Sequence, residues 1–377
     1  MSCCSSRSLH AGVREAQVRR RQRPKADTAG ARAAPHIYDS FMHWNNLARL
    51  RDHLTRTERE GAVITRRANI AWLTGADTHV DGASPFAICR LHVTPTDCTV
   101  VTDTIEAPRL RVEELEGGDS LNYEVRDWFA PAPPVPEGWL SDENADFCQS
   151  LRASLSVPEL DAVRTLGRDC ADIMQQAMHD VRPGMTEHQL AARIVGDLRM
   201  HGIFTPVMLV AADQRLPAYR HPIPTYHKIN RTVMAAICAQ RHGLIVSITR
   251  LVHFGPLADD LKRRHIACQQ VDATLHEATR PGARWCDILQ RGIDTYAAHG
   301  YADEWKRHHQ GGPMGYAARD FVATPTETRT VQPDQLVGWN PSVTGTKCED
   351  TILSSGQVLT SMRDWPTTNG HADILVM

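Results

Sequence analysis

The chain contains histidines in segments where an imidazole could transfer protons. His221 stands in a Tyr-Arg-His-Pro segment, and His309 stands in a His-His-Gln-Gly-Gly run. An imidazole has an ordinary pKa of about 6.5, so it can accept or donate a proton at neutral pH. The alternative is a histidine that makes only structural hydrogen bonds in a strand or loop, which we expect for His227 and His253. Both His221 and His309 are candidates for a catalytic role, and proton transfer is expected of His221.

Other polar side chains near these segments could contact a substrate. Tyr316 and Arg319 follow the glycine-rich run and offer a hydroxyl group and a partner for a carboxylate. Arg319 fits a surface salt bridge equally well. Cys238 fits a nucleophile if a histidine lies beside it, or else an inert buried thiol. Arg241, three residues further along, is another candidate for substrate binding.

The composition excludes several classes of protein. The chain has 377 residues and a formal net charge of −2, which gives no electrostatic reason to expect nucleic acid or an anionic membrane as partner. No apolar run approaches the roughly 18 residues of a membrane span. The ten cysteines are expected to be reduced, because a chain of this length does not need a disulfide framework. We expect a cytoplasmic protein of enzyme size.

The first 36 residues are basic and contain few apolar residues, unlike the rest of the chain. A signal peptide needs an apolar central region, which this segment lacks. We expect residues 1–36 to be a disordered tail, with a transit peptide as the alternative. Cys3 and Cys4 lie side by side in it, without partners at the spacing of metal ligands.

Hydrophobic periodicity divides the remainder into a smaller domain over residues 37–150 and a larger one over residues 151–377. The smaller domain begins with an amphipathic helix from Asn45 to Gly61 and continues with strands, which is typical of an α/β domain. A proline-rich loop at 131–136 lies near its end. The strands are predicted at residues 62–65, 86–93 and 98–102.

The larger domain is predicted to contain two similar halves. A helix is expected from Glu159 to Met178, and Thr186 is a suitable N-cap for another helix from Glu187 to Met200. The Arg-Pro-Gly before the second helix and the His-Gly after it both recur 98 residues later. A start and a stop that recur at one offset favour an internal repeat. Two unrelated helices with the same turn chemistry are the alternative.

This repeat, with Arg-Pro-Gly-Met-Thr-Glu in its first half, resembles the pita-bread fold of methionine aminopeptidase, aminopeptidase P, prolidase and creatinase. The Asn-Ile-Ala-Trp-Leu-Thr-Gly segment at 69–75 is similar to the N-terminal domain that creatinase and aminopeptidase P place in front. The resemblance implies an α+β fold. In it, a pita-bread domain with an internal pseudo-two-fold repeat follows a smaller α/β domain of the creatinase type.

In the metal-dependent members of this family, five ligands occur in the order Asp, Asp, His, Glu, Glu. The resemblance places Cys238, Ser247, His309, Asn340 and Glu349 at these positions. Two divalent cations about 4 Å apart repel each other and need carboxylates to offset their charge. Since three of the four carboxylates are replaced, we expect no two-metal site and no cofactor. A single zinc ion at Cys238, His309 and Glu349 is the alternative.

The resemblance also implies roles for individual side chains. His221 is similar to the histidine that acts as general acid and base in creatinase, which needs no metal. Glu349 is expected to orient the attacking water, and His309 to bind substrate or to stabilise negative charge. The remaining candidates for substrate binding are Cys238, Ser247, Asn340, Tyr316, Arg319 and Arg241.

These expectations combine into one function. We expect a creatinase-like hydrolase that cleaves an amide-type or amidine-type C–N bond in a small polar substrate, without a dinuclear metal site. The alternatives are an Xaa-Pro aminopeptidase or dipeptidase, and a non-catalytic pita-bread domain that binds a peptide or a protein partner. The resemblance further implies a homodimer, the commonest assembly of soluble oligomers.

Overall fold

The structure, a computed structural model, describes residues 41–78, 80–115 and 121–377. The predicted tail, with Cys3 and Cys4, lies outside the described residues. The eight cysteines inside them form no disulfide with one another, and their reduced state stays a prediction. No helix in the described ranges is both long and apolar enough to cross a membrane.

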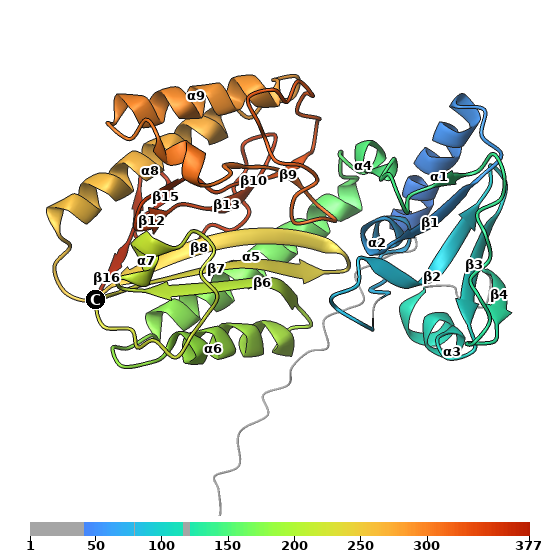
Figure 1. Cartoon of the computed structure of the whole chain (residues 1–377), viewed down its shortest axis with the longest axis horizontal. Coiled ribbons are helices and arrows are strands. Elements are labelled where there is room, and N and C mark those ends of the chain that lie inside the picture. The colour runs from blue at the N-terminus through green and yellow to red at the C-terminus, as the bar shows by residue number, and fades with distance from the viewer. Residues whose placement is uncertain (1–40, 79, 116–120) are drawn as a thin grey trace, which may run out of the picture. The chain divides into compact units, whose positions relative to one another are not determined.

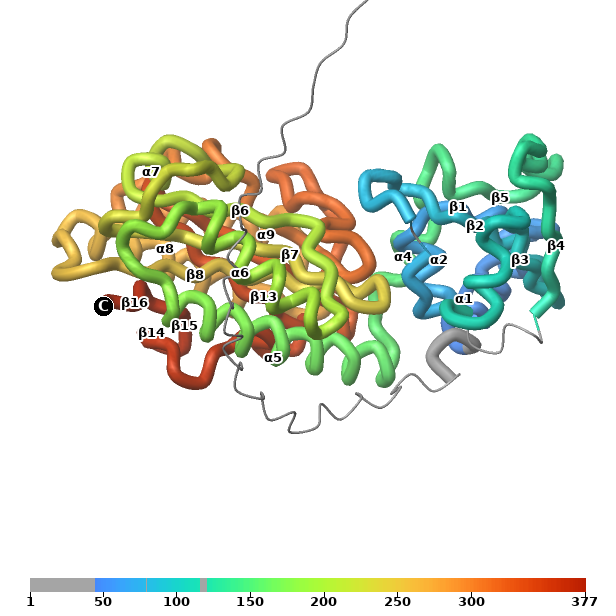
Figure 2. Tube along the Cα trace, turned by 90° about the horizontal axis from the view of Figure 1, so that it is seen from below, coloured from blue at the N-terminus to red at the C-terminus, as the bar shows by residue number. Residues whose placement is uncertain are grey.

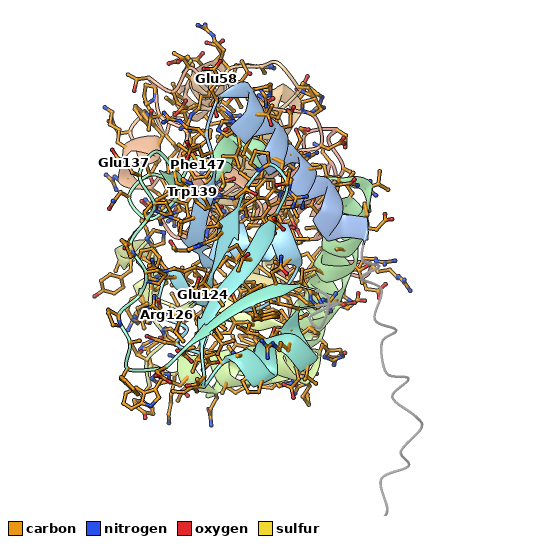
Figure 3. All side chains as sticks on the ribbon, turned by 90° about the vertical axis from the view of Figure 1, so that its right-hand side faces the viewer. Glu58, Glu124, Arg126, Glu137, Trp139 and Phe147 are labelled. Carbon is orange, nitrogen blue, oxygen red and sulfur yellow. The ribbon has the colours of Figure 1, made fainter. Side chains whose placement is uncertain are left out.

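The N-terminal domain is built on a five-stranded sheet. Its elements are α1 (Phe41–Arg56), β1 (Ala62–Arg66), α2 (Arg67–Thr74), β2 (Phe86–Val93), β3 (Cys98–Asp103), α3 (Ala107–Arg109), a π-helical turn (Leu110–Glu114), β4 (Asn122–Arg126), β5 (Leu140–Ser141) and α4 (Cys148–Leu151). The strand order is β4-β3-β2-β1-β5, with β3–β4 and β1–β5 parallel. Figure 3 shows Glu124 and Arg126 on β4 and Trp139 just ahead of β5.

The sequence located the elements of this domain well. The strand predicted at 86–93 is β2, and the proline-rich segment at 131–136 has no regular structure. Helix α1, however, ends at Arg56, before the predicted end at Gly61. The helix stops early because Glu58 adopts a left-handed conformation, with φ of 53°.

The first half of the C-terminal domain packs two helices against a sheet. Its elements are α5 (Val157–His179), α6 (Glu187–Met200), β6 (Phe204–Ala212), α7 (Arg215–Ala218), β7 (Thr232–Arg241) and β8 (Leu244–His253). Helix α6 begins as predicted, because the Thr186 hydroxyl accepts a hydrogen bond from the backbone N–H of Gln189 at 3.2 Å. Helices α5 and α6 lie along the antiparallel strands β6, β7 and β8 (Figure 1).

The second half repeats this plan with a second helix pair over further strands. Its elements are α8 (Asp259–Ala278), α9 (Trp285–Ala298), a 3-10 helix (Glu304–Arg307), β9 (Gly311–Met314), β10 (Leu336–Trp339), β11 (Ser342–Val343), β12 (Thr346–Lys347), β13 (Asp350–Leu353), β14 (Thr367–Thr368), β15 (His371–Ala372) and β16 (Leu375–Val376). Strands β13, β10 and β9 form one sheet, and β16 pairs with β8. Figure 2 shows β14, β15 and β16 together near the C-terminus. The predicted pairing of helices in each half is confirmed.

Strands β9 and β10 approach each other closely at Gly311. This residue has φ of 109°, and a Cβ atom on it would lie 2.1 Å from the carbonyl oxygen of Gly338. Only glycine fits such a position without moving the backbone. The close approach lets the backbone N–H of Asn340 donate to the carbonyl oxygen of Gln310 at 3.0 Å. The segment around His309 is thereby held against the segment around Asn340.

Candidate active site

The β7–β8 hairpin places Cys238 opposite Ser247. The two residues are paired across the hairpin, and Cys238 Sγ lies 3.3 Å from Ser247 Oγ. Both side chains are buried. Burial, together with the nearby charge of Glu349, raises the pKa of the Cys238 thiol above its ordinary value. A protonated thiol is a poor nucleophile, so the structure favours the inert thiol over the nucleophile.

Glu349 is buried between two cationic side chains. Lys347 Nζ donates to Glu349 Oε2 at 2.6 Å, and Arg319 Nη2 donates to Glu349 Oε1 at 3.1 Å. The hydroxyl group of Thr249, on β8, donates to Oε2 at 2.7 Å. Burial raises the pKa of Glu349, but the charges of Lys347 and Arg319 outweigh it and hold this pKa below its ordinary value. The carboxylate is therefore ionised and hydrogen-bonded through both of its oxygens.

This set of residues does not fit the pair of metal ions that the resemblance implies. The five ligand positions offer one carboxylate, that of Glu349. An ionised carboxylate has about four acceptor positions, and here three are used by Lys347, Arg319 and Thr249. The positive charges that balance Glu349 belong to the protein itself. The following acid, Asp350, is likewise paired with a cation of the chain, Arg250, at 2.8 Å.

Three histidines, His221, His308 and His309, form the other part of the site, which we call the histidine cluster. The Nε2 atoms of His221 and His308 lie 3.0 Å apart. Each residue offers one ring nitrogen, and these three nitrogens lie within 4.8 Å of one another. The other nitrogen of His308, Nδ1, lies 3.3 Å from Ser342 Oγ, on β11. A chain of hydrogen bonds therefore runs from Ser342 through His308 to His221.

All three imidazoles of the histidine cluster are neutral at neutral pH. Burial, followed by the charge of Lys347, lowers the pKa of His308 to about 2. Burial and the charge of Arg319 lower the pKa of His309 to about 4. Burial and Lys347 also lower the pKa of His221, while Glu349 acts in the opposite direction. The charge of Lys347 lowers the pKa of all three histidines, and the same side chain is paired with Glu349. The histidine cluster and the Glu349 ion pairs therefore belong to one site.

The histidine cluster lines a cavity of about 450 Å³, whose walls also include Arg220, Trp305 and Thr324. Two buried atoms of the site, His309 Nδ1 and Asn340 Oδ1, have no hydrogen-bond partner among the described residues. Buried polar atoms in proteins are nearly always paired. Because His309 lines the cavity, its Nδ1 marks a position where a bound molecule could complete a hydrogen bond.

Arg220 fixes the segment that carries His221. Its guanidinium group pairs with Glu304 at 2.5 Å and donates to the hydroxyl groups of Thr344 at 2.8 Å and Ser342 at 3.1 Å. Since Ser342 also contacts His308, one hydroxyl group ties both histidine segments together. The position of His221 relative to His308 is thus set by side chains of the second half of the domain.

Two predicted substrate-binding residues have structural partners instead. The Tyr316 hydroxyl group donates to Glu159 Oε1 at 2.7 Å, and Arg241 pairs with Asp169 of α5 at 2.7 Å. Their contact with substrate stays a prediction. The expected structural role of His253 agrees with its contacts, since its Nδ1 lies 2.7 Å from the hydroxyl oxygen of Thr232.

The predicted zinc group of Cys238, His309 and Glu349 is not formed. Among the described residues, His309 is grouped with His221 and His308, while Glu349 faces Lys347 and Arg319. The expectation of no metal at all also lacks support, because three neutral imidazoles are legitimate ligands for a transition metal.

Sequence reasoning missed two residues of the site, Lys347 and His308. Lys347 lies two residues before Glu349, and alternate residues of an extended segment share a face, so the spacing was a usable signal. His308 is adjacent to His309, but the family pattern assigns only one histidine in this run. The hydrogen bond from His308 to His221 joins residues 87 positions apart, which no local pattern can reveal.

Comparisons with known proteins agree with this architecture. Residues 161–357, more than half of the chain, match metallopeptidase family M24. The chain belongs to this family. Residues 46–157 match the creatinase/prolidase N-terminal domain. The prediction of a creatinase-type N-terminal domain followed by a pita-bread domain is therefore confirmed.

Several solved structures share the fold at low sequence identity. The dipeptidase PepE from Mycobacterium ulcerans superposes with a TM-score of 0.71 at 18% identity, over 90% of this chain and 99% of its own. The prolidase from Pyrococcus horikoshii gives 0.69 at 15%, over 85% and 99%. The N-terminal domain of the FACT complex subunit SPT16 from chickpea gives 0.65 at 11%, over 86% and 97%. No curated protein matches the sequence. These likenesses confirm the α+β pita-bread fold.

Proposed function

We propose that the chain hydrolyses an amide-type C–N bond of a small polar substrate in the cavity of the histidine cluster, without a pair of metal ions. The observation that carries this proposal is the chain from Ser342 through His308 to His221. A base that is neutral at working pH and is oriented by a second group is the usual arrangement for general base catalysis.

His221 is the proposed proton carrier. Its Nε2 is engaged by His308, which leaves Nδ1 to take a proton from water as the water oxygen bonds to the carbonyl carbon. The same proton then passes to the leaving nitrogen as the C–N bond breaks, so His221 returns to its neutral form. Because the pKa of His308 is about 2, His308 stays neutral while His221 carries the proton.

Other residues of the site are suited to substrate binding and charge stabilisation. His309 Nδ1 and Asn340 Oδ1 are the buried atoms that a substrate would satisfy. Lys347 and Arg319 supply fixed positive charge close to the histidine cluster. Such charge stabilises the negative oxygen that develops when water adds to a carbonyl group. In this arrangement the two basic side chains do electrostatically part of what a metal ion does in a metallopeptidase.

Membership of a peptidase family favours a peptide as substrate, so Xaa-Pro dipeptides form the second candidate class. The solved structures of similar fold include a prolidase and a dipeptidase. A non-catalytic binding protein is the third possibility. The hydrogen-bonded chain that ends at His221 argues against it, since binding alone does not require a neutral, oriented base.

A substrate panel separates these functions. The chelator-treated protein is incubated with Xaa-Pro dipeptides, other dipeptides, and small amides and amidines that include creatine, and amine release is measured. We expect turnover of at least one class, at a rate that added manganese or cobalt does not change. Hydrolysis that appears only with these metals would contradict the metal-independent mechanism. Binding of a peptide without any hydrolysis across the panel would support the binding protein.

We also propose that the chain forms a homodimer. The support is its resemblance to creatinase and aminopeptidase P and the prevalence of two-fold symmetry among soluble oligomers. Light scattering at micromolar concentration should give about twice the 42.0 kDa mass of one chain. A constant mass of one chain across a dilution series would overturn this expectation.

A further inference from the structure

A second group of side chains that could hold a metal ion, distinct in its residues from the histidine cluster, lies between helix α8 and strand β15. Asp272 and His276 are four residues apart on α8, so they share one face of the helix. His371 reaches them from β15, with its Nδ1 2.7 Å from Asp272 Oδ2. The other carboxylate oxygen, Asp272 Oδ1, lies 3.4 Å from His276 Nε2. One atom from each residue falls within a common 4.8 Å.

Two atoms of this group, which lie 3.4 Å from each other, are buried without a hydrogen bond. Asp272 is 2% exposed, yet its Oδ1 has no hydrogen bond among the described residues, and neither does His276 Nε2. A buried carboxylate oxygen without a partner is strongly unfavourable, because burial removes its water. One ligand atom of each of the three side chains lies within 4.8 Å of the others, so a single ion could reach all three.

We propose that Asp272, His276 and His371 bind one divalent transition-metal ion, of which zinc is the best fit. Zinc takes imidazole nitrogen and carboxylate oxygen at about 2.0–2.2 Å, which separates neighbouring ligands of a tetrahedral site by about 3.3 Å. The 3.4 Å separation of His276 Nε2 from Asp272 Oδ1 is close to that value. The 2.7 Å separation of His371 Nδ1 from Asp272 Oδ2 is a hydrogen bond, which a bound ion would replace. Calcium and magnesium are excluded as the preferred ions because they favour sites made of oxygen ligands.

The histidine cluster of the active site is a weaker candidate for a dication. It contains no carboxylate, and the charges of Lys347 and Arg319 act directly on its members. The same charges would repel a bound metal ion. The site on α8 instead includes a carboxylate, which offsets half of the charge of the ion. The inference is independent of the proposed hydrolase function.

The bound ion would fasten the C-terminal segment to the body of the domain. His371 belongs to the short β14–β15 hairpin, and β16 follows it to pair with β8, the strand that carries Ser247. Two-residue strands contribute few backbone hydrogen bonds of their own, so a metal link from β15 to α8 gives the segment a strong anchor. The ion therefore has a structural role.

The test is zinc binding by the full-length protein after chelator treatment, measured by competition with a chromophoric chelator. We expect one equivalent that is weakened at least about 100-fold in Asp272→Asn, His276→Ala and His371→Ala, because each variant loses a ligand. Asp272→Asn keeps the size of the side chain, so a loss of zinc binding in this variant reflects the missing carboxylate rather than misfolding. His299→Ala, at the exposed end of α9, is the control that should bind zinc as the unchanged protein does.

Thermal unfolding gives a second measurement. Zinc should raise the melting temperature of the wild-type protein and of His299→Ala, because the ion binds only to the folded site. The melting temperature of His276→Ala should not respond to zinc. If zinc binding survives all three ligand variants and is lost in His309→Ala, the ion belongs to the histidine cluster and the proposal is wrong. If the unchanged protein binds no zinc, Asp272 and His371 form an ion pair only, which also overturns it.

Discussion

Replacing His221 by alanine is expected to lower kcat by about 10²–10⁴-fold on whichever substrate the panel identifies, with little change in KM. The reason is that His221 is the exposed end of the hydrogen-bonded chain that begins at Ser342. Alanine removes the only group to which we assign the proton. The measurement is steady-state kinetics on both proteins, with circular dichroism to confirm that the fold is intact.

The pH dependence adds a sharper signature of the same residue. A general base must be unprotonated, so kcat/KM should be constant above the pKa of His221 and should fall as the pH drops through it. Burial and Lys347 lower this pKa below its ordinary value of 6.5, so the fall is expected on the acid side of pH 6.5. Replacing Lys347 removes a charge that lowers the pKa, and should move the fall towards higher pH.

Two comparisons make the expectation specific to His221. His201→Ala removes an exposed histidine at the end of α6 and should leave kcat unchanged. His308→Ala removes the residue that positions His221, so it should lower kcat and shift the pH profile together. If kcat stays near normal in His221→Ala while His309→Ala is inactive, the proton carrier is a group other than His221.

The sequence predicts the framework of this protein because the framework depends on local signals. Helix α6 has the predicted bounds because the Thr186 cap and the amphipathic spacing act within a few residues. Strand β2 likewise coincides with its predicted range. The pairing of Cys238 with Ser247 was not predicted, although it too depends on a local feature, the tight turn at Gly243 that fixes the register of the hairpin.

The charge balance of the site could not be predicted in the same way. The family pattern identifies Glu349 as a surviving ligand position, but the partner that decides its chemistry, Arg319, lies in another segment. Whether a buried carboxylate meets a metal ion or a basic side chain depends on contacts across the fold. The zinc site considered for Cys238, His309 and Glu349 is not formed for this reason. All three side chains have atoms that can bind zinc, but in the fold they contact different neighbours.

The pairing of Lys347 with Glu349 leads to the second large expected effect. Lys347→Met should lower the free energy of unfolding by about 3 kcal/mol, because it leaves a buried carboxylate with one cation fewer. Both side chains are nearly inaccessible to water, with exposed fractions of 7% and 5%. We place the effect at the lower end of the usual range because Arg319 remains beside Glu349. Urea unfolding of both proteins measures the difference.

A matched control and a double variant identify the cause. Lys306→Met breaks the exposed pair with Asp303, so its effect should stay within about 1 kcal/mol. Lys347→Met is also made in the Glu349→Gln background, where the lysine has lost its ionic partner, and should cost less stability there than in the wild-type protein. If the lysine replacement costs as much in that background as in the wild-type protein, lost packing of its side chain explains the effect better than charge.

The pH dependence of this effect follows from the pKa of Glu349. Its pKa in the folded protein lies below the ordinary value of 4.5, so the unfolded chain binds the proton more tightly. The stability that the ion pairs contribute is therefore fully present above pH 4.5 and is lost as the pH falls through the folded pKa. The unchanged protein should thus lose its advantage over Lys347→Met below pH 4.5. An advantage that persists undiminished under these acidic conditions would mean that Glu349 stays charged without Lys347, and that the lysine does not take the place of a metal ion in balancing this carboxylate.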